Sequence, residues 1–202
     1  MRAKLDKQRT LENLIRDKGI VVEDKPFTLS SGKTSQYYYD LKQAILTPEG
    51  LNLVGDLGLE IVKGLKAKSV GGLESGSIPF ATTISARSHG TANPMQSFFV
   101  RKQAKEHGRR KWIEGNIESP AVIVDDVITT GKSALDAVKK LEETDCKVIA
   151  VVAIVDREEG ANQLFAKEGL RLYSMFSHSR NFKAFIDKQI ASKQNKEIYQ
   201  PA

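Results

Sequence analysis

VIVDDVITTGKS, residues 122–133, reads as an apolar strand followed by a polar turn and the first residues of a helix. The turn TTGKS offers backbone N–H groups, hydroxyls and a helix N-terminus, all of which suit a phosphate dianion. Gly131 permits a close backbone approach that a side chain would obstruct. Asp125 and Asp126, at the expected end of the strand, would repel a phosphate, but their oxygens accept hydrogen bonds from sugar hydroxyls. The stretch therefore predicts a site for a ribose 5-phosphate.

The segments on either side alternate between strand and helix patterns. Apolar and β-branched residues predict strands in SVGGLE, QSFFVRK, PAVIV, KVIAVVAIV and LRLYSMF. Capping residues and apolar spacing predict helices over residues 48–65, 78–90, 133–144 and 161–167, and from Asn181 onward. KVIAVVAIV is almost wholly apolar, as expected of a strand buried on both faces. This alternation predicts an α/β fold with a mainly parallel central sheet flanked by helices.

The N-terminal part follows a different pattern. Leu11, Leu14 and Ile15 place an apolar stripe on a first short helix. FTLSSGKTSQYYYDL then alternates small polar and aromatic residues, which predicts a hairpin or an extended segment. Because no linker rich in proline, glycine or serine divides the chain, residues 1–202 are predicted to form a single domain.

The composition is that of one globular domain, with 202 residues that are 40% hydrophobic and 28% charged. No run reaches the ~18 apolar residues of a membrane helix, and the charged N-terminal stretch lacks the apolar core of a secretory signal. Cys146 is the only cysteine, so we expect neither an intrachain disulfide nor a zinc site of cysteines and histidines. A reducing cytoplasm is the simplest location, and no membrane partner is expected.

The formal charge of +6 is concentrated in one segment. Residues 101–111 hold six basic residues against Glu106 alone, and the rest of the chain has 25 basic and 24 acidic residues. A general nucleic-acid binder usually spreads its cations over a face. The concentration predicts that one compact polyanion is bound in one place, without a nucleic-acid partner.

Two other interpretations of the glycine-containing turns are weaker. Gly131-Lys132-Ser133 resembles the end of a Walker loop, but the required first glycine would fall at Asp126. Gly32-Lys33-Thr34 fails in the same way, because Phe27 stands in that place. Nucleotide hydrolysis is therefore not expected. The remaining alternative is that TTGKS is a solvent-exposed helix cap and the two acids belong to a turn.

VIVDDVITTGKS resembles the phosphoribosyl-pyrophosphate signature of the type I phosphoribosyltransferases. FTLSSGKTSQYYYD, VRKQAKEHG, the signature and VDREEG together resemble orotate phosphoribosyltransferases, in the same order and over roughly residues 27 to 160. The resemblance implies a type I phosphoribosyltransferase fold with a small N-terminal hood and a mobile basic loop. It implies a glycosyltransferase of pyrimidine (UMP) biosynthesis, which joins orotate to 5-phosphoribosyl 1-pyrophosphate and forms orotidine 5′-phosphate and pyrophosphate.

The basic segment 101–108 resembles the family's mobile catalytic loop, RKxxKxHG. As the bond from the anomeric carbon to pyrophosphate breaks, negative charge builds on the leaving group, and nearby cations stabilise it. The resemblance assigns pyrophosphate contacts to Arg101, Lys102, Lys105 and His107, with Lys105 the most rate-critical and His107 a hydrogen-bond donor. It also implies a homodimer in which this loop completes the neighbouring subunit's site.

The resemblance assigns the phosphoribosyl-pyrophosphate site to the signature and to the loop GGLESGSIP, residues 71–79. The residues are Asp125, Asp126, Val127, Ile128, Thr129, Thr130, Gly131, Lys132, Ser133, Glu74, Ser75 and Gly76. Many members carry a lysine where this chain has Gly76, and another where it has Ser30. Mg²⁺ is expected as a cofactor held mainly through the substrate, so no set of protein metal ligands is predicted.

Orotate is a planar pyrimidine with a carboxylate, for which a bidentate arginine is the natural partner. The resemblance gives that role to Arg157, with Thr129 as hydroxyl partner and Tyr38 and Tyr39 as an aromatic pair beside the base. Those tyrosines could equally be core or hairpin residues. His89 and His178 have no motif around them and are expected to be incidental.

Two other functions remain open on the sequence. A phosphoribosyltransferase for another base would share most of these motifs, but Arg157 favours a carboxylated base. A non-catalytic regulator that senses the sugar pyrophosphate would need a nucleic-acid-binding region. Only about 26 residues precede the first family motif, too few for a winged helix. The chain is also too short for a following decarboxylase domain.

Overall fold

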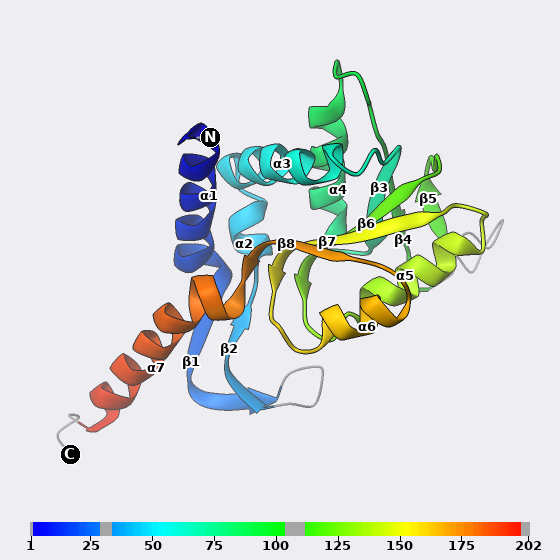
Figure 1. Ribbon diagram of the computed structural model, residues 1–202. Helices are drawn as coiled ribbons and strands as arrows, with labels where there is room; N and C mark the ends of the chain where they lie inside the picture. Colours follow the sequence, from blue (N-terminus) through cyan, green and yellow to red (C-terminus); the bar gives the residue numbers. More distant parts are fainter. Residues whose placement is uncertain (1, 29–33, 104–111, 199–202) are drawn as a thin grey trace.

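The computed structural model describes residues 2–28, 34–103 and 112–198 of the chain. Within these ranges, a six-stranded sheet runs in the order β5-β4-β3-β6-β7-β8 (Figure 1). The strands are β3 (Ser69–Leu73), β4 (Gln96–Val100), β5 (Ile113–Gly115), β6 (Ala121–Ile128), β7 (Val148–Asp156) and β8 (Leu172–Ser177). All neighbours are parallel except β4 and β5. The predicted α/β fold is confirmed, and β5 is an addition that its three residues were too few to signal.

Helices cover both faces of this sheet. One buried cluster packs α3 (Pro48–Lys63) and α4 (Ser77–Ser88) against it, and the other packs α5 (Lys132–Glu142) and α6 (Ala161–Lys167). Successive residues of β6 point to opposite clusters: Val122 and Val124 join the first, and Ala121 and Ile123 the second. β7 alternates in the same way from Ala150 to Ile154. Two-sided burial explains why both strands read as nearly continuous apolar runs.

The N-terminal segment forms the hood. It comprises α1 (Arg2–Leu14), the π-helical turn η1 (Ile15–Gly19), an antiparallel hairpin of β1 (Ile20–Thr28) and β2 (Thr34–Tyr39), and the short helix α2 (Lys42–Ile45). Leu11 and Ile15 of the predicted stripe are fully buried. Figure 1 shows the C-terminal helix α7 (Lys183–Ile198) beside β1, where Lys193 pairs with Asp24 at 2.8 Å. A second π-helical turn, η2 (His178–Phe182), precedes α7, so that helix begins two residues later than predicted.

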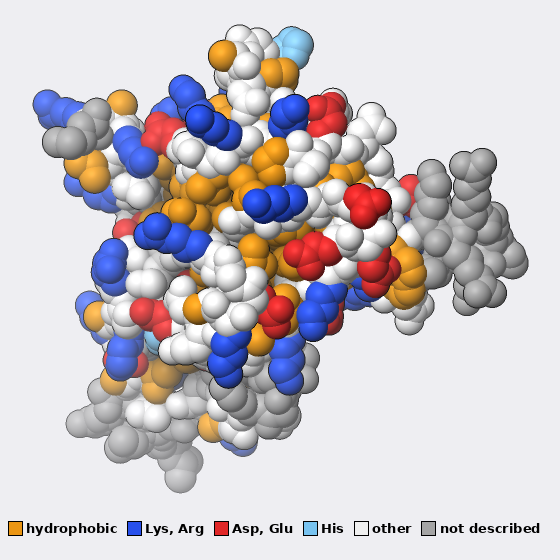
Figure 2. All heavy atoms as spheres, turned by 45° about the vertical axis from the view of Figure 1, so that its right-hand side comes forward, with side chains coloured by type: hydrophobic (Ala, Val, Ile, Leu, Met, Phe, Trp, Pro, Cys, Tyr) orange, Lys and Arg blue, Asp and Glu red, His pale blue; other side chains and the backbone are white. Residues whose placement is uncertain are grey.

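The predicted start of α3 is confirmed by its capping bond. The Gly50 amide donates to Thr47 Oγ1 at 3.0 Å, and Pro48 occupies the first helical turn, where it has no amide to leave unpaired. No described helix is long and apolar enough to span a membrane. On the face shown in Figure 2, acidic and basic side chains are interspersed around a band of hydrophobic ones.

Close packing of α3 on α4 predicts opposite effects of alanine at two glycines of α3. A Cβ on Gly58 would lie 2.7 Å from Phe80 and 2.8 Å from Ile84, both fully buried, so Gly58→Ala should destabilise the fold by about 1–3 kcal/mol. Gly64 ends the helix at φ −68°, with only Ile61 O within 4 Å at 3.8 Å. Gly64→Ala should therefore be neutral or stabilise by about 0.4–1 kcal/mol. Urea unfolding of both variants measures the difference, and equal stabilities would contradict the close contact.

Candidate active site

The two acids of the signature lie on a strand, not in a turn. The sequence placed the end of the strand at Asp125 and Asp126, but β6 runs on to Ile128. Pairing with β7 continues through the Ile128–Asp156 position, whereas pairing with β3 stops opposite Ile123. Because pairing with β7 holds the backbone extended, Asp125 and Asp126 remain in the strand. Beyond Val124, β6 has lost its β3 neighbour, and the two acids lie where β3 gives way to the next loop.

A pocket of about 200 Å³ opens at this edge. Its walls come from five segments: α2, the end of β3 and the following loop, the start of the basic segment, the acids of β6, and the first turn of α5. The lining residues are Leu73, Glu74, Ser75, Gly76, Lys102, Asp125, Asp126 and Ser133, with Lys42 from α2. Seven residues predicted from sequence thus lie together, and Lys42 was missed because no motif surrounds it.

Two contacts shape this pocket. Glu74 Oε1 accepts the amide of Lys102 at 2.7 Å, which ties the start of the basic segment to the loop after β3. A Cβ on Gly76 would lie 2.3–2.5 Å from the three carboxyl atoms of Asp126. Any side chain at residue 76 would therefore displace Asp126. This contact accounts for the glycine at residue 76.

The paired carboxyl groups disfavour their own negative charge. Burial raises the pKa of Asp125 well above its ordinary value, and the neighbouring Asp126 carboxylate raises it further. Backbone amides partly offset this: Asp126 N donates to Asp125 Oδ1 at 3.1 Å, and Val127 N donates to Asp126 Oδ1 at 3.0 Å. A ligand with hydroxyl donors, or one carrying a cation, would complement these oxygens.

The donor set also bears on magnesium. Among the described residues, no group of three or more His, Cys, Asp or Glu side chains is arranged to hold a metal ion. The pocket nevertheless presents carboxylate oxygens from Asp125 and Asp126. Mg²⁺ commonly binds one or two carboxylates and completes its shell with water and substrate phosphates. These residues fit that arrangement.

Several predicted residues lie outside the pocket lining. The Ile128 side chain is buried in the α5–α6 cluster, so only its backbone can reach a ligand, a correction to its place in the predicted site. Arg101 is directed at Glu114, with Nη1 3.5 Å from Oε1. Lys105 and His107 are outside the described residues. Val127, Thr129, Thr130 and Lys132 complete the segment and their ligand contacts stay predictions; Val127, Thr129 and Thr130 are half-buried and Lys132 is exposed.

Gly131 has the left-handed backbone that starts α5. Its φ is +84°, a value that side chains rarely allow. A Cβ there would also lie 3.0 Å from Phe165 and 3.2 Å from Ala161 on α6. The glycine thus lets the turn pass close to α6 and directs the N-terminus of α5 toward the carboxyl edge of the sheet.

Arg157 lies on the other side of β6. Its amide donates to Ile128 O at 2.8 Å, and its Nε pairs with Glu159 at 2.9 Å. The guanidinium carbon lies 5.1 Å from the ring centre of Tyr37 and 5.7 Å from that of Tyr39. These distances are within cation–π range. The arginine side chain is only 9% exposed, so its charge is largely shielded from bulk water.

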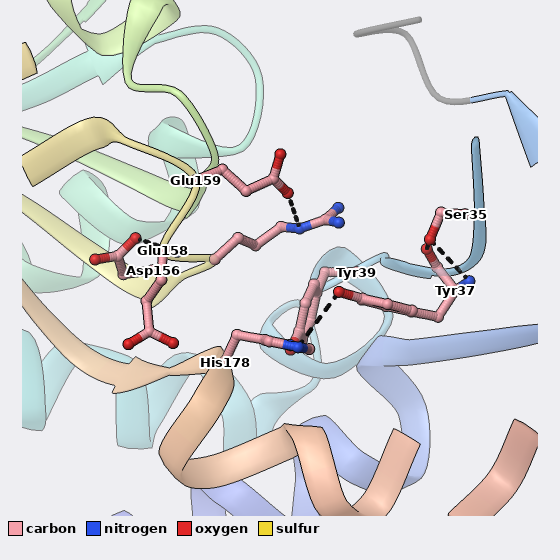
Figure 3. Close-up of polar contacts among 8 residues, drawn as sticks. Ser35, Tyr37, Tyr39, Asp156, Glu158, Glu159 and His178 are labelled. Atoms are coloured by element: carbon pink, nitrogen blue, oxygen red, sulfur yellow. Dashed lines mark hydrogen bonds and ion pairs between the residues drawn. The ribbon is translucent and has the colours of Figure 1, made fainter. Parts of the chain in front are cut away.

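The structure corrects the predicted aromatic pair. Tyr39 lies near Arg157, but Tyr38 points to the opposite side of β2 and packs edge-on against Phe27, with ring centres 5.6 Å apart. The reason is the two-residue period of a strand, which puts residues 37 and 39 on one side and 38 on the other. The pair beside the arginine is therefore Tyr37 and Tyr39. Ser35 Oγ, which accepts the Tyr37 amide, holds this part of β2 (Figure 3).

His178, expected to be incidental, joins the same cluster. Its Nδ1 lies 2.9 Å from the Tyr39 hydroxyl, and its ring stacks on Tyr37 with centres 5.4 Å apart and planes 4° from parallel (Figure 3). The residue follows β8 at the carboxyl edge of the sheet. That strand-end position was the available signal, because ligands of such sheets bind at this edge.

The segment VDREEG fixes Arg157 with its own carboxylates. Asp156 accepts the Glu158 amide at 2.8 Å and the Asn162 side chain at 3.1 Å, and burial raises its pKa. The Glu158 carboxylate accepts hydrogen bonds from the Ser179 amide at 2.6 Å and from the Ser179 hydroxyl at 2.9 Å. The hydrogen bond from the amide lowers the pKa of Glu158. The arginine turn is therefore joined to the segment that carries His178.

Comparisons with known proteins agree with this geometry. Residues 47–167 match the model of the phosphoribosyl transferase domain. An orotate phosphoribosyltransferase of Aquifex aeolicus is 45% identical over 172 residues, which cover 84% of this chain and 94% of that protein. The orotate phosphoribosyltransferase of Mycobacterium tuberculosis, solved with 5-phospho-α-D-ribosyl 1-diphosphate, is 34% identical with a TM-score of 0.71, covering 86% of this chain and 97% of that one.

A more distant neighbour shows the fold alone. Adenine phosphoribosyltransferase of Leishmania donovani superposes with a TM-score of 0.57 at 16% identity, over 84% of this chain and 80% of its own. The architecture is thus shared by proteins named for different bases.

The raised pKa of Asp125 predicts a pH-dependent stability gain in Asp125→Asn. The folded-state pKa lies above the unfolded one, so the stability that wild type has in acid is lost as pH rises through the carboxyl range. The variant should match wild type near pH 3 and melt higher at pH 7. Asp136→Asn, at an exposed position of α5, is the control and should show no such gain. Thermal unfolding at both pH values decides, and a lower melting temperature at pH 7 would contradict the prediction.

Proposed function

Because this chain belongs to the orotate phosphoribosyltransferase family, we propose that it transfers the 5-phosphoribosyl group of 5-phosphoribosyl 1-pyrophosphate to orotate. The products are orotidine 5′-phosphate and pyrophosphate, in the synthesis of UMP. The observation that carries this proposal is the end of β6, which has a carboxylate-lined pocket on one side and Arg157 on the other. One side suits a sugar phosphate and the other a carboxylated base.

The sugar pyrophosphate would occupy the pocket in a defined direction. Asp125 and Asp126 would accept hydrogen bonds from the ribose hydroxyls, and residues 129–133 would receive the 5′-phosphate at the N-terminus of α5. Glu74, Ser75 and Gly76, with Lys102, would border the pyrophosphate. The base would then approach the anomeric carbon from the Arg157 side of β6.

Mg²⁺ would be held by pyrophosphate and ribose oxygens, with Asp125 and Asp126 as the nearest protein carboxylates. Its chemical contribution would be to neutralise charge on the leaving pyrophosphate. Lys102 would add a cation from the protein, and the remaining cations would come from the basic segment.

Arg157 would select the base. Its Nε is engaged by Glu159, which orients the guanidinium so that the Nη groups can bind the orotate carboxylate in a bidentate manner. Thr129, half-buried in the turn after β6, would supply a hydroxyl partner. Adenine and guanine have no carboxylate, so this arginine favours orotate over the alternative bases. A purely regulatory role would need only the sugar-pyrophosphate site, and it would not explain the basic segment or Arg157.

We also propose a cytoplasmic homodimer in which Lys105 and His107 complete the partner's site. The match of residues 101–108 to the family's RKxxKxHG loop supports this, because that loop is expected to reach the neighbouring subunit's site.

The first test is the reaction itself. Purified protein should consume orotate, followed by its ultraviolet absorbance, only when both 5-phosphoribosyl 1-pyrophosphate and Mg²⁺ are present. Omission of either, and replacement of Mg²⁺ by chelator, are the controls. Consumption of adenine, guanine or uracil in place of orotate would overturn the substrate assignment, and binding of the sugar pyrophosphate without any turnover would favour the regulator.

The dimer proposal predicts complementation between two inactive variants. Lys105→Ala and Arg157→Ala should each be nearly inactive, since one preorganised charge contact in the transition state is commonly worth ~10²–10³ in rate. In a mixed dimer, one site carries both defects and the other carries neither. Equal mixing gives about half heterodimers, so roughly a quarter of wild-type activity should return. Differently tagged chains verify the exchange, and heterodimers as inactive as their parents would refute a shared site.

A further inference from the structure

His178 stands where three separate segments meet beside the proposed base site. β2 contributes Tyr37 and Tyr39, the turn after β7 contributes Arg157, and η2 contributes the histidine itself. The labelled side chains in Figure 3 show the histidine against both tyrosines, with Glu158 on the turn beside it. None of these contacts involves the pocket lined by Asp125 and Asp126.

A hydrogen bond joins the Tyr39 hydroxyl to His178 Nδ1 at 2.9 Å, and Nε2 lies 3.5 Å from the Tyr37 hydroxyl. Burial raises the pKa of Tyr39 above its ordinary value, so its hydroxyl keeps its proton. Burial and the charge of Arg157 lower the pKa of His178, which favours the neutral ring. In a neutral ring one nitrogen donates and the other accepts, so either tautomer can serve both tyrosine hydroxyls.

The ring of His178 also sets the angle between the tyrosines. It lies parallel to Tyr37 and nearly perpendicular to Tyr39, at 4° and 87°. The two tyrosine rings are themselves at 89°, with centres 6.0 Å apart. Both rings lie within cation–π distance of the Arg157 guanidinium. Removal of the imidazole would take away the stacking partner of Tyr37 and the hydrogen-bond partner of Tyr39, while Tyr39 would keep its edge contact with Phe182.

The backbone that carries His178 is held by bonds that do not use its ring. Ser177 N donates to Asn181 Oδ1 at 3.0 Å, and both the amide and the hydroxyl of Ser179 donate to Glu158. Phe182, fully buried, anchors the end of η2. The segment therefore keeps its backbone hydrogen bonds when the imidazole is replaced, so a substitution at this residue can be interpreted in terms of ligand binding.

We propose that His178 is a positioning residue of the base site, which sets the affinity for orotate by orienting Tyr37 and Tyr39 beside Arg157. The inference rests on the proposed function for the identity of the base. It predicts a selective effect: the Michaelis constant for orotate depends on residue 178, and that for the sugar pyrophosphate does not.

Three substitutions separate the hydrogen bond from the bulk of the ring. In His178→Asn the amide can occupy the place of Nδ1 and keep the Tyr39 bond. In His178→Gln the amide lies nearer the place of Nε2, and His178→Leu keeps volume without polarity. Asn and Leu substitutions of His89, an exposed residue at the end of α4, are the matched controls.

The expected result is a graded series. His178→Leu and His178→Gln should raise the orotate Michaelis constant about 3–10-fold, the equivalent of one net hydrogen bond, with His178→Asn recovering most of that loss. The constant for the sugar pyrophosphate and the melting temperature should stay close to wild type, and the His89 variants should change nothing. A double variant of His178→Leu with Tyr39→Phe should be no worse than the larger single effect, whereas Tyr38→Phe should add independently.

Each other outcome overturns the inference. Unchanged orotate constants in all three variants, equal losses for both substrates, or no advantage of Asn over Leu would show that His178 does not act through Tyr39. If instead the wild-type protein fails to consume orotate at all, the proposed function is wrong, and that failure is visible before any variant is made.

Discussion

Burial of β6 and β7 between two hydrophobic clusters is the constraint on which the rest of the structure depends. A strand buried on both faces can carry polar residues only near its end, where it extends beyond a neighbouring strand. β6 outlasts β3 by the residues that include Asp125 and Asp126, and β7 ends at Asp156, directly before Arg157. The whole candidate site therefore forms at the carboxyl edge of the sheet, with chemistry supplied by the residues that the core cannot accept.

The order of strands and helices could be predicted because apolar periodicity reports burial directly. The pocket could be predicted as well, since Glu74, Lys102 and Asp125 all follow parallel strands or lie at their ends. Local patterns failed where a tertiary neighbour decided the outcome. The predicted strand end at Asp125 and Asp126 falls short of Ile128 because the pairing with β7 is invisible in the sequence, and β5 is too short to show any period. The predicted pair of Tyr38 and Tyr39 is wrong for a local reason, because neighbouring residues of a strand point to opposite sides and only Tyr37 and Tyr39 share one.

The two halves of the site differ in sign but are not independent. One half holds carboxyl groups that repel each other, which favours a ligand with hydroxyl donors or a cation. The other half holds a buried arginine, which favours an anionic ligand. The bond from the Arg157 amide to Ile128 O joins them across β6. A displacement of the turn after β6 would therefore move Arg157 along with residues 129–133. Under the proposed function, rigid coupling of this kind would keep the two substrates at a fixed separation, which a bond-forming reaction between them requires.

Contact between Gly76 and the Asp126 carboxylate has an evolutionary consequence. A residue with a side chain cannot enter at 76 while the acid keeps its present rotamer, because the two would occupy the same space. A side chain at 76 therefore requires the Asp126 carboxylate to turn to another rotamer, so the effect of a substitution at one position depends on the residue at the other. Residues 76 and 126 are expected to vary together among related chains, since neither can change its size without a change at the other.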